Sequence, residues 1–207
     1  TAAALARDAC AVEIERVGEP IGKQDQYIAA YGGLRFIEFN PDDTVKVSAI
    51  RCSAAKRALL ERSLLLFYTG KTRRAGSILR GVSGAAGKKR ADLRELRGLA
   101  DRARSALESG SVSDFGGLLH EGWLLKKSLH KEISNPTIDE AYARCRRAGA
   151  EGGKILGAGG GGFLLVFARP ERQAAVRAAL AGWRELSFGF ELEGSRIVYC
   201  DRKGERT

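Results

Sequence analysis

The sequence predicts an α+β protein whose C-terminal part has a ferredoxin-like order of elements. Three observations support this prediction: short apolar runs alternate with helical segments, an Asn-Pro pair at Asn135 starts a helix, and two strands flank a run of glycines. From residue 63 onward the order is β-α-(helical insertion)-β-β-α-β, with three helices in the insertion. Such an order builds one sheet with helices on one face.

The N-terminal part predicts one helix and one hairpin. Apolar residues at helical spacing predict a helix over 2–17, which Gly18-Glu19-Pro20 ends. A Gly-rich turn over 21–27 follows. The polar–apolar alternation of 44–50 predicts a strand that pairs with 34–39 through an Asn-Pro-Asp-Asp turn.

The rest of the chain is predicted from apolar runs and helix caps. Residues 63–68 are a continuous apolar run, which is typical of a buried strand, and Asn135-Pro136 is typical of a helix start. That helix ends at Gly149. The other expected elements are helices over 72–80, 90–108, 113–130 and 170–182, a flexible connection over 81–87, and strands over 154–156, 163–167, 186–190 and 195–200.

Composition narrows the classes of function. The 207 residues carry a net charge of +10, which suits nucleic acid, a membrane surface or phosphorylated small molecules and does not choose among them. No apolar run approaches the roughly 18–20 residues needed to span a bilayer. Four separated cysteines predict reduced thiols in a cytoplasmic protein, and two histidines disfavour a His-based metal site. The chain contains no Met, so we expect it to be the C-terminal portion of a longer protein.

A run of five glycines in six positions is the strongest local signal in the sequence. This glycine loop comprises Gly157, Ala158, Gly159, Gly160, Gly161 and Gly162. Glycines let backbone N–H groups approach a phosphate without obstruction by Cβ atoms. A dinucleotide-binding loop would open a helix, whereas a strand follows here, and a P-loop would continue with Lys and Ser or Thr. A plain hairpin bend and a phosphate-binding loop both remain open.

Several charged residues are candidates for chemistry. Asp25 lies between two amides and near Lys23, and an ionised carboxylate can accept a hydroxyl proton, although a solvated turn is the simpler interpretation. Arg73 follows the end of an apolar strand, where ligand sites often lie. Lys126 and Lys127 are expected on the wet side of a helix or beside an anionic substrate. Basic residues over 88–104 are interleaved with acidic ones, which favours a solvated helix face over a nucleic-acid surface.

Three segments together resemble the GHMP small-molecule kinases, the superfamily of galactokinase, homoserine kinase and mevalonate kinase. Residues 154–162 (KILGAGGGG) are similar to the third glycine motif of that family, whose strand-loop-strand setting explains the missing helix. Residues 22–27 (GKQDQY) resemble the segment that carries the catalytic Asp in sugar kinases. Residues 69–75 (TGKTRRA) resemble a strand-end segment with a recurring Arg, matching best at Arg73.

Other stretches resemble those family members that act on D-glycero-D-manno-heptose 7-phosphate. They are residues 19–27, 36–41, 120–129 and 133–136, so the resemblance covers nearly the whole chain. It implies transfer of the γ-phosphoryl group of ATP to the anomeric hydroxyl, giving a heptose 1,7-bisphosphate. That product feeds nucleotide-activated heptose for surface polysaccharide.

The resemblance also implies a role for each candidate residue. Asp25 is expected to accept or orient the hydroxyl proton, and Lys23 to stabilise the alkoxide or the transferring group. The glycine loop is expected to support the phosphate pocket. Arg73 is the first candidate for phosphate charge, followed by Lys126 and Lys127 for the sugar phosphate. Gln26 and Tyr27 are further substrate candidates.

The implied GHMP kinase fold divides the chain at residue 60. Residues 1–60 are expected to end an N-terminal S5-like domain, and residues 61–207 to form the C-terminal domain. The expected cofactors are ATP and Mg²⁺, with the magnesium ligands and the adenine pocket upstream of Thr1, so no metal ligand is assigned here. The missing N-terminal half is therefore an expected partner. The piece alone is expected to be inactive, and poorly stable unless it associates.

Two alternatives remain. The first is another sugar 1-kinase, for galactose, fucose or mannose. The second is a non-catalytic module that binds anions or nucleic acid, which would leave the segments around Asp25 and Gly157 without a joint explanation. We therefore expect a sugar phosphate and ATP as small-molecule partners, and neither nucleic acid nor a membrane.

Overall fold

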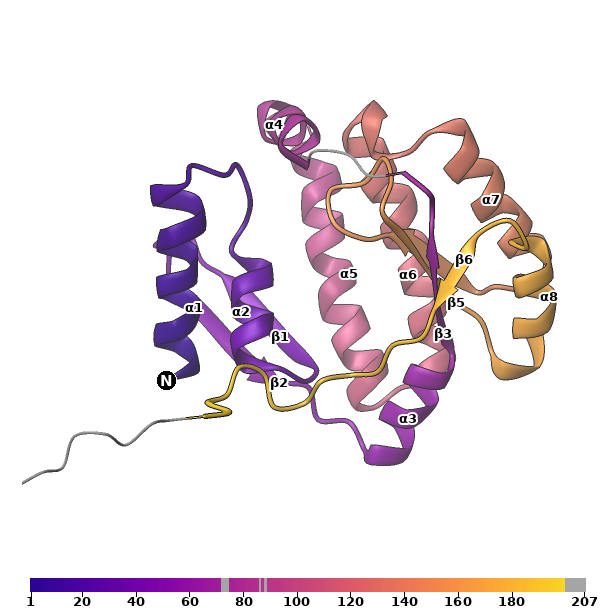
Figure 1. Ribbon diagram of the computed structural model, residues 1–207, viewed down its shortest axis with the longest axis horizontal. Helices are drawn as coiled ribbons and strands as arrows, with labels where there is room; N and C mark the ends of the chain where they lie inside the picture. The colour runs from indigo at the N-terminus through magenta and orange to yellow at the C-terminus, as the bar shows by residue number, and fades with distance from the viewer. Residues whose placement is uncertain (72–74, 86, 88, 200–207) are drawn as a thin grey trace, which may run out of the picture. The chain divides into compact units, whose positions relative to one another are not determined.

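The computed structural model describes residues 1–71, 75–85, 87 and 89–199. The chain forms two compact units (Figure 1). The N-terminal unit comprises Thr1–Ala49 together with Phe190–Thr207, and the central unit comprises Ile50–Gly189. The division into family domains at residue 60 stays a prediction, because these units are defined only by internal packing.

The N-terminal unit consists of two helical segments and a hairpin. Its elements are α1 (Ala2–Cys10), the π-helical η1 (Ala11–Arg16), α2 (Gln24–Tyr31), β1 (Arg35–Phe39) and β2 (Val45–Ala49). The expected helix over 2–17 and the hairpin are confirmed, and the antiparallel register places Ile37 opposite Val47. The prediction of a turn over 21–27 was wrong in its second half, because α2 begins there.

The end of the chain returns to the N-terminal unit without forming the expected strand. Residues 195–199 have no strand structure. Instead, the hydroxyl of Ser195 donates to Ala29 O at 3.1 Å, and the N–H of Gly33 donates to Glu191 O at 2.7 Å. The chain therefore bonds the end of α2 through a loop, which leaves no ladder for a strand to join.

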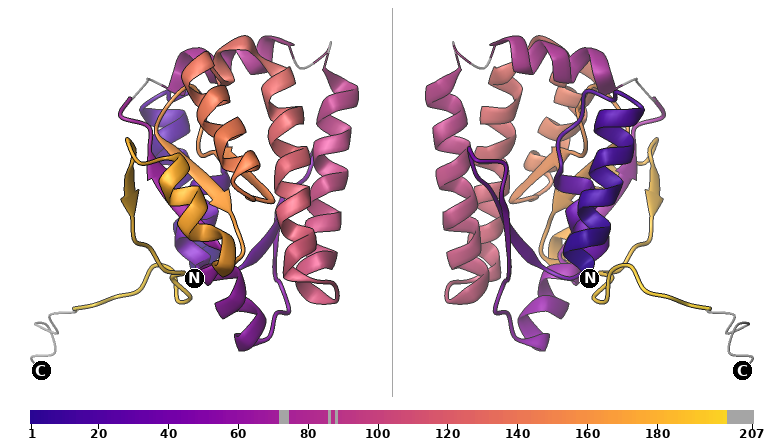
Figure 2. Two further views of the ribbon diagram at one scale, coloured as in Figure 1. Left: turned by 90° about the vertical axis from the view of Figure 1, so that its right-hand side faces the viewer. Right: turned by 90° about the vertical axis from the view of Figure 1, so that its left-hand side faces the viewer.

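The central unit contains one four-stranded sheet and most of the helices. Its elements are α3 (Ala54–Arg62), β3 (Leu64–Tyr68), α4 (Ala75–Ala85), α5 (Arg90–Glu108), α6 (Val112–Leu129), the 3-10 turn η2 (Lys131–Ile133), α7 (Pro136–Arg147), β4 (Gly152–Ile155), β5 (Phe163–Phe167), the 3-10 turn η3 (Pro170–Arg172), α8 (Gln173–Ala179) and β6 (Arg184–Leu186). The strands lie in the order β4-β5-β3-β6, with every neighbouring pair antiparallel. This arrangement confirms the ferredoxin-like prediction. The inserted helices α5 and α6 lie side by side, and α7 packs beside α8 (Figure 2).

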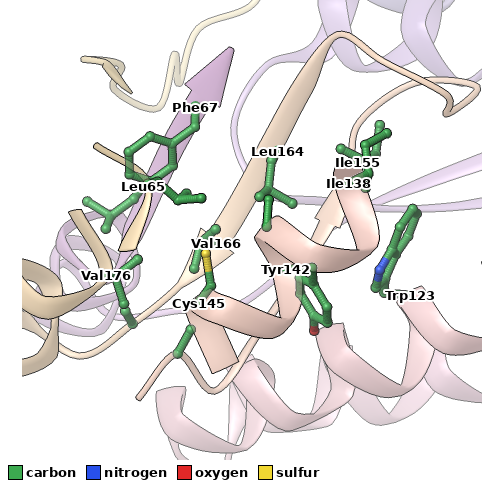
Figure 3. Close-up of a cluster of buried hydrophobic side chains, with 14 of the residues drawn as sticks. Leu65, Phe67, Trp123, Ile138, Tyr142, Cys145, Ile155, Leu164, Val166 and Val176 are labelled. Carbon is green, nitrogen blue, oxygen red and sulfur yellow. The ribbon is translucent and has the colours of Figure 1, made fainter. Parts of the chain in front are cut away.

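The core of the central unit lies between one face of the sheet and helices α7 and α8 (Figure 3). Alternate residues of β3 and β5 point into it, because side chains of a strand alternate between the two faces. Phe67 and Leu164 are opposite one another in the register and are 1% and 0% exposed. Trp123 extends this core to α6, where its ring meets Tyr142 edge-on at 6.3 Å.

Three further predictions for the central unit need correction. Helix α4 continues to Ala85 rather than giving way to a flexible connection at 81, because Ile78 and Val82 both pack against the core. Strand β6 lies at 184–186, earlier than expected, where it pairs with β3. Helix α3 was not expected, although the side chain of Ser53 caps it by accepting from Lys56 N–H at 3.2 Å.

Candidate functional site

The backbone of the glycine loop is held from two sides. It joins β4 to β5, as the sequence predicts. Gly160 N–H donates to Ile133 O at 2.8 Å, and Gly162 N–H donates to Lys71 O at the same distance. Thr69 N–H donates to Gly162 O at 2.9 Å. The loop therefore has a fixed conformation set by the end of β3 and by η2, whereas a plain hairpin bend needs no such supports.

Close backbone approach explains why glycine stands at two of these positions. A Cβ atom at Gly161 would lie 2.7 Å from Lys71 O, and one at Gly159 would lie 2.7 Å from Ile133 O. Gly159 also has a φ of +108°, which other residues rarely adopt. The N–H groups of Gly157, Ala158 and Gly161 donate to no acceptor in the part of the chain that the structure describes. These donors suit the oxygens of a phosphate group.

Lys126 fastens the start of the loop to α6. Its ammonium donates to Gly157 O at 2.5 Å and lies 3.4 Å from Ile155 O. Burial, together with the nearby charge of Lys154, lowers the pKa of Lys126 to about 8. Burial also lowers the pKa of Lys154. Lys126 thus supports the loop directly, and two of its donors are already used by backbone carbonyls.

Lys127 points to a different partner. Its ammonium donates to Asp139 Oδ1 at 2.9 Å and lies 5.8 Å from the centroid of the Trp123 ring. The carboxylate of Asp139 also accepts from the Ser134 hydroxyl at 2.8 Å. These contacts favour a structural role in joining α6 to α7. Arg73, the other cation predicted to contact phosphate, lies outside the described residues.

A cavity of about 630 Å³ lies beside the glycine loop, entirely within the central unit. Lys71, Lys131, Glu132, Ser134, Thr137 and Gly160 are among the residues that line it. The side chain of Asn135 caps α7 by accepting from Ile138 N–H, and its Nδ2 donates to Gly160 O at 3.3 Å. The Asn-Pro cap is a sequence signal for this region, but Lys131 and Thr137 were not singled out from the sequence.

Asp25 lies in the first turn of α2, in the N-terminal unit. Its side chain is exposed and has no hydrogen bond or ion pair with another residue in the described ranges. A carboxylate near a helix N-terminus is favoured by the helix dipole. Asp25 is therefore free to act on a ligand without losing a structural contact.

Lys23 comes just before α2 and is paired with the turn of the hairpin. Its ammonium donates to Asp43 Oδ1 at 2.8 Å, and this hydrogen bond raises the pKa of Lys23. Asp43 is 90% exposed and has a φ of +62°. The charge of Lys23 is thus partly compensated, and any role toward a transferring group competes with this ion pair.

Gln26 and Tyr27 are both buried in the N-terminal unit. Gln26 Nε2 donates to Glu13 Oε2 at 2.6 Å, while its buried Oε1 accepts no hydrogen bond from a residue that the structure describes. The ring of Tyr27 stacks on Tyr31 at 6.4 Å and meets Phe39 edge-on at 6.2 Å. Both side chains hold the turn that carries Asp25, which favours a structural role over contact with a substrate.

The two histidines have structural surroundings, in line with their lack of a partner signature in the sequence. His120 Nδ1 lies 2.7 Å from the Tyr142 hydroxyl, and burial lowers the pKa of His120 and raises that of Tyr142 to about 12. His130 Nδ1 accepts from Glu132 N–H at 3.3 Å. Within the described ranges, no three His, Cys, Asp or Glu side chains gather in a metal-binding cluster.

Two of the arginines of α5 are paired with carboxylates. Arg102 forms a two-pronged contact with Glu121, at 2.8 and 3.3 Å, and Arg104 lies 3.3 Å from Glu108. These pairs favour the interpretation of a solvated helix face. Among the described helices, none has the length and apolarity that a membrane span requires.

Comparison with known proteins extends these observations. Residues 103–184 match the family "GHMP kinases C terminal". Over 179 residues the chain is 32% identical to D-glycero-alpha-D-manno-heptose 7-phosphate kinase of Campylobacter jejuni, an alignment that covers 85% of this chain and 52% of that protein. A bifunctional fucokinase/GDP-fucose pyrophosphorylase of Arabidopsis thaliana is 29% identical, covering 74% of this chain and 15% of that protein.

A solved structure shows the same arrangement. A D-glycero-D-manno-heptose 1-phosphate kinase from Bacteriodes thetaiotaomicron superimposes with a TM-score of 0.67 and 28% identity, covering 94% of this chain and 55% of that one. The chain thus spans about half the length of the two heptose kinases that it matches. The ferredoxin-like central unit and its glycine loop agree with these matches: over residues 103–184 the chain matches the C-terminal domain of GHMP kinases.

Proposed function

We propose that the protein containing this chain is an ATP-dependent sugar kinase that phosphorylates the anomeric hydroxyl of D-glycero-D-manno-heptose 7-phosphate. The observation that carries the proposal is the 32% identity with a heptose 7-phosphate kinase over 85% of the chain. The product, a heptose 1,7-bisphosphate, would enter nucleotide-activated heptose for surface polysaccharide. A cytoplasmic location belongs to the same proposal, because ATP and sugar phosphates are available there.

In this proposal, Asp25 accepts or orients the proton of the attacking hydroxyl. As the new P–O bond forms, the bond between the γ-phosphorus and the β–γ bridging oxygen breaks, and ADP leaves. The carboxylate of Asp25, which is exposed and has no partner among the described residues, supports this role. Lys23 would help only to the extent that its ammonium leaves Asp43.

The glycine loop would hold phosphate oxygens of ATP. The unpaired N–H groups of Gly157, Ala158 and Gly161 fit that task. The chemistry that Mg²⁺ supplies in phosphoryl transfer is neutralisation of phosphate charge. Among the described residues, no three His, Cys, Asp or Glu side chains gather in a cluster that could hold it.

The test is an assay of ADP release by the natural protein that contains these 207 residues. The acceptors are heptose 7-phosphate, fucose, galactose and mannose. Selective turnover of heptose 7-phosphate supports the proposal, and Asp25→Asn is expected to lower kcat about 10²–10⁴-fold. Asp8→Asn, which removes an exposed carboxylate of the same unit, is the matched control and is expected to keep full activity.

Other outcomes have definite meanings. Turnover of fucose alone would replace the substrate and keep the reaction, in keeping with the similarity to a fucokinase. Silence with every sugar would overturn the proposal. We also propose that the 207-residue piece has no activity by itself; Asp25-dependent ADP release from the piece, supplied with millimolar Mg-ATP and heptose 7-phosphate, would contradict this.

A further inference from the structure

We propose that the cavity beside the glycine loop binds the phosphate group that the sugar substrate already carries, with Lys71 and Lys131 as its cationic ligands. This inference rests on the proposed function, because it names the part of the chain that selects a sugar phosphate over a neutral sugar. It differs from the sequence-based prediction, which assigned the sugar phosphate to Lys126 and Lys127.

The four lysines near the glycine loop and the cavity differ in whether they already have partners. Lys126 donates to two backbone carbonyls, and Lys127 is paired with Asp139. Lys71 and Lys131 both line the cavity, are exposed, and have no ion-pair partner among the residues that the structure describes. An anion is therefore attracted to Lys71 and Lys131 without first displacing a carboxylate.

The cavity has a polar lining. Thr137 lines it, and neither its hydroxyl nor its N–H donates to another of the described residues. The hydroxyl of Ser134 is already used by Asp139. Among the described residues that line the cavity, Glu132 contributes one carboxylate and Lys71 and Lys131 contribute two ammonium groups. This set provides donors for a phosphate.

The cavity and the glycine loop share residues and hydrogen bonds. Gly160 lines the cavity and bonds Ile133 and Asn135, while Lys71 O accepts from Gly162 N–H. The volume of about 630 Å³ lies within the range of small-molecule sites, roughly 300–1,000 Å³. A sugar phosphate held here lies against the loop proposed to hold the phosphates of ATP. The proposed occupant is the phosphate of the sugar, and the binding experiment below distinguishes it from a phosphate of the nucleotide.

The experiment measures binding to the natural protein that contains these 207 residues by calorimetry, with each probe titrated separately so that no turnover occurs. The probes are heptose 7-phosphate, the unphosphorylated heptose, inorganic phosphate and ATP. The test variant is Lys71→Ala/Lys131→Ala. The control variant is Arg94→Ala/Arg97→Ala, which removes the same charge from an exposed face of α5. Circular dichroism establishes that both variants are folded.

We expect the test variant to bind heptose 7-phosphate about 10–100-fold more weakly, the loss typical of hydrogen bonds to charged groups. The control variant should change that affinity less than twofold, and the unphosphorylated heptose should bind the parent much more weakly than the phosphate ester. Equal affinity of parent and test variant for heptose 7-phosphate overturns the inference. So does a loss confined to ATP, which would assign the cavity to the nucleotide.

The two proposals fail in different assays. If the natural protein phosphorylates only neutral sugars yet still needs Lys71 and Lys131 to bind heptose 7-phosphate, the proposed function fails and the cavity remains a sugar-phosphate site. If the natural protein phosphorylates heptose 7-phosphate and the lysines do not matter for binding, the inference fails alone.

Discussion

The two units of the chain differ in how firmly they support the residues expected to act. The described core of the central unit contains 17 buried residues in a single cluster, and the glycine loop is bonded to the end of β3, to η2, to Lys126 of α6 and to Asn135. The N-terminal unit has a cluster of only four, namely Ala6, Cys10, Tyr27 and Ala30. Asp25 therefore lies on a unit with a small buried core, whereas the proposed phosphate-binding loop lies on a unit with a large one.

Exposed apolar surface makes the same contrast. In the N-terminal unit Leu5, Val12, Val17 and Phe39 are between 46% and 64% exposed. A two-stranded hairpin packed on little else is marginally stable in water. Burial of apolar area, rather than secondary structure content, is thus what separates the two units.

Removal of a central core side chain should have the largest effect. Phe67→Ala deletes a ring that is 1% exposed in the middle strand of the sheet, and we expect it to lower the free energy of unfolding of the central unit by about 3–5 kcal/mol. Denaturant unfolding, monitored by amide exchange of β3 and β5, measures this loss of stability. Leu124→Ala, at a 47% exposed position of α6, is the control and should cost less than about 0.5 kcal/mol. A loss under about 1 kcal/mol for Phe67→Ala would contradict the dense core.

Truncation of Tyr27 tests the thin core. Tyr27→Ala should lower the free energy of unfolding of the N-terminal unit by about 2–4 kcal/mol, somewhat less than for a deep ring, because a small core can collapse around the gap. The unit has little stability to lose, so amide protection in α2 and β1 should vanish. Tyr27→Phe keeps the ring and should retain protection. Full protection of α2 in Tyr27→Ala would show that the four-residue cluster is not what holds this unit.

Much of the fold follows from local signals in the sequence. The apolar runs of β3 and β5 and the Asn135 cap of α7 are strong because they are short-range and chemically specific. Helix α2 was hidden because its sequence, QDQYIAAY, buries Gln26 along with Tyr27 and Ala30, so apolar periodicity is weak. Helix α4 extends through Gly81 because tertiary packing overrides its glycines; a Cβ there would meet the ring of His130.

The candidate site was predictable in its residues and less so in their roles. The glycine loop was identified from composition and resemblance, and the structure adds the backbone contacts that fix it. No local pattern distinguishes a lysine bonded to carbonyls, such as Lys126, from one without a partner among the described residues, such as Lys131. That difference depends on residues 29 and 31 positions away, at Ile155 and Gly157.

A methyl group added to the glycine loop should have an intermediate effect. In Gly161→Ala the new Cβ would lie 2.7 Å from Lys71 O, so the backbone must shift, and we expect a loss of about 1–3 kcal/mol together with faster exchange of Gly162 N–H. Gly98→Ala, in the exposed interior of α5 with no atom within 4 Å, should instead stabilise by about 0.5–1 kcal/mol. Equal effects of the two substitutions would mean that the loop is not tightly held.

The smallest expected effect is a difference between the two units in how their stability depends on pH. Burial lowers the pKa of Lys126 to about 8 from 10.5, so the unfolded chain binds more protons between those values and the stability of the central unit rises with pH there. In Lys126→Met this rise should be smaller by at most about 1.4 kcal/mol per pH unit. Burial raises the pKa of Cys145 to about 11 and lowers that of Lys154 in both proteins, so the difference between them isolates Lys126.

Lys23 in the N-terminal unit should show the opposite trend. Its hydrogen bond to Asp43 raises its pKa, so the stabilisation is fully present below pH 10.5 and is lost as pH rises through the higher folded value. Stability measured unit by unit from pH 7 to about 12, in the parent, Lys126→Met and Lys23→Met, distinguishes the two lysines. A common pH trend, unchanged by either substitution, would refute the contrast between a lysine held by carbonyls and one held by a carboxylate.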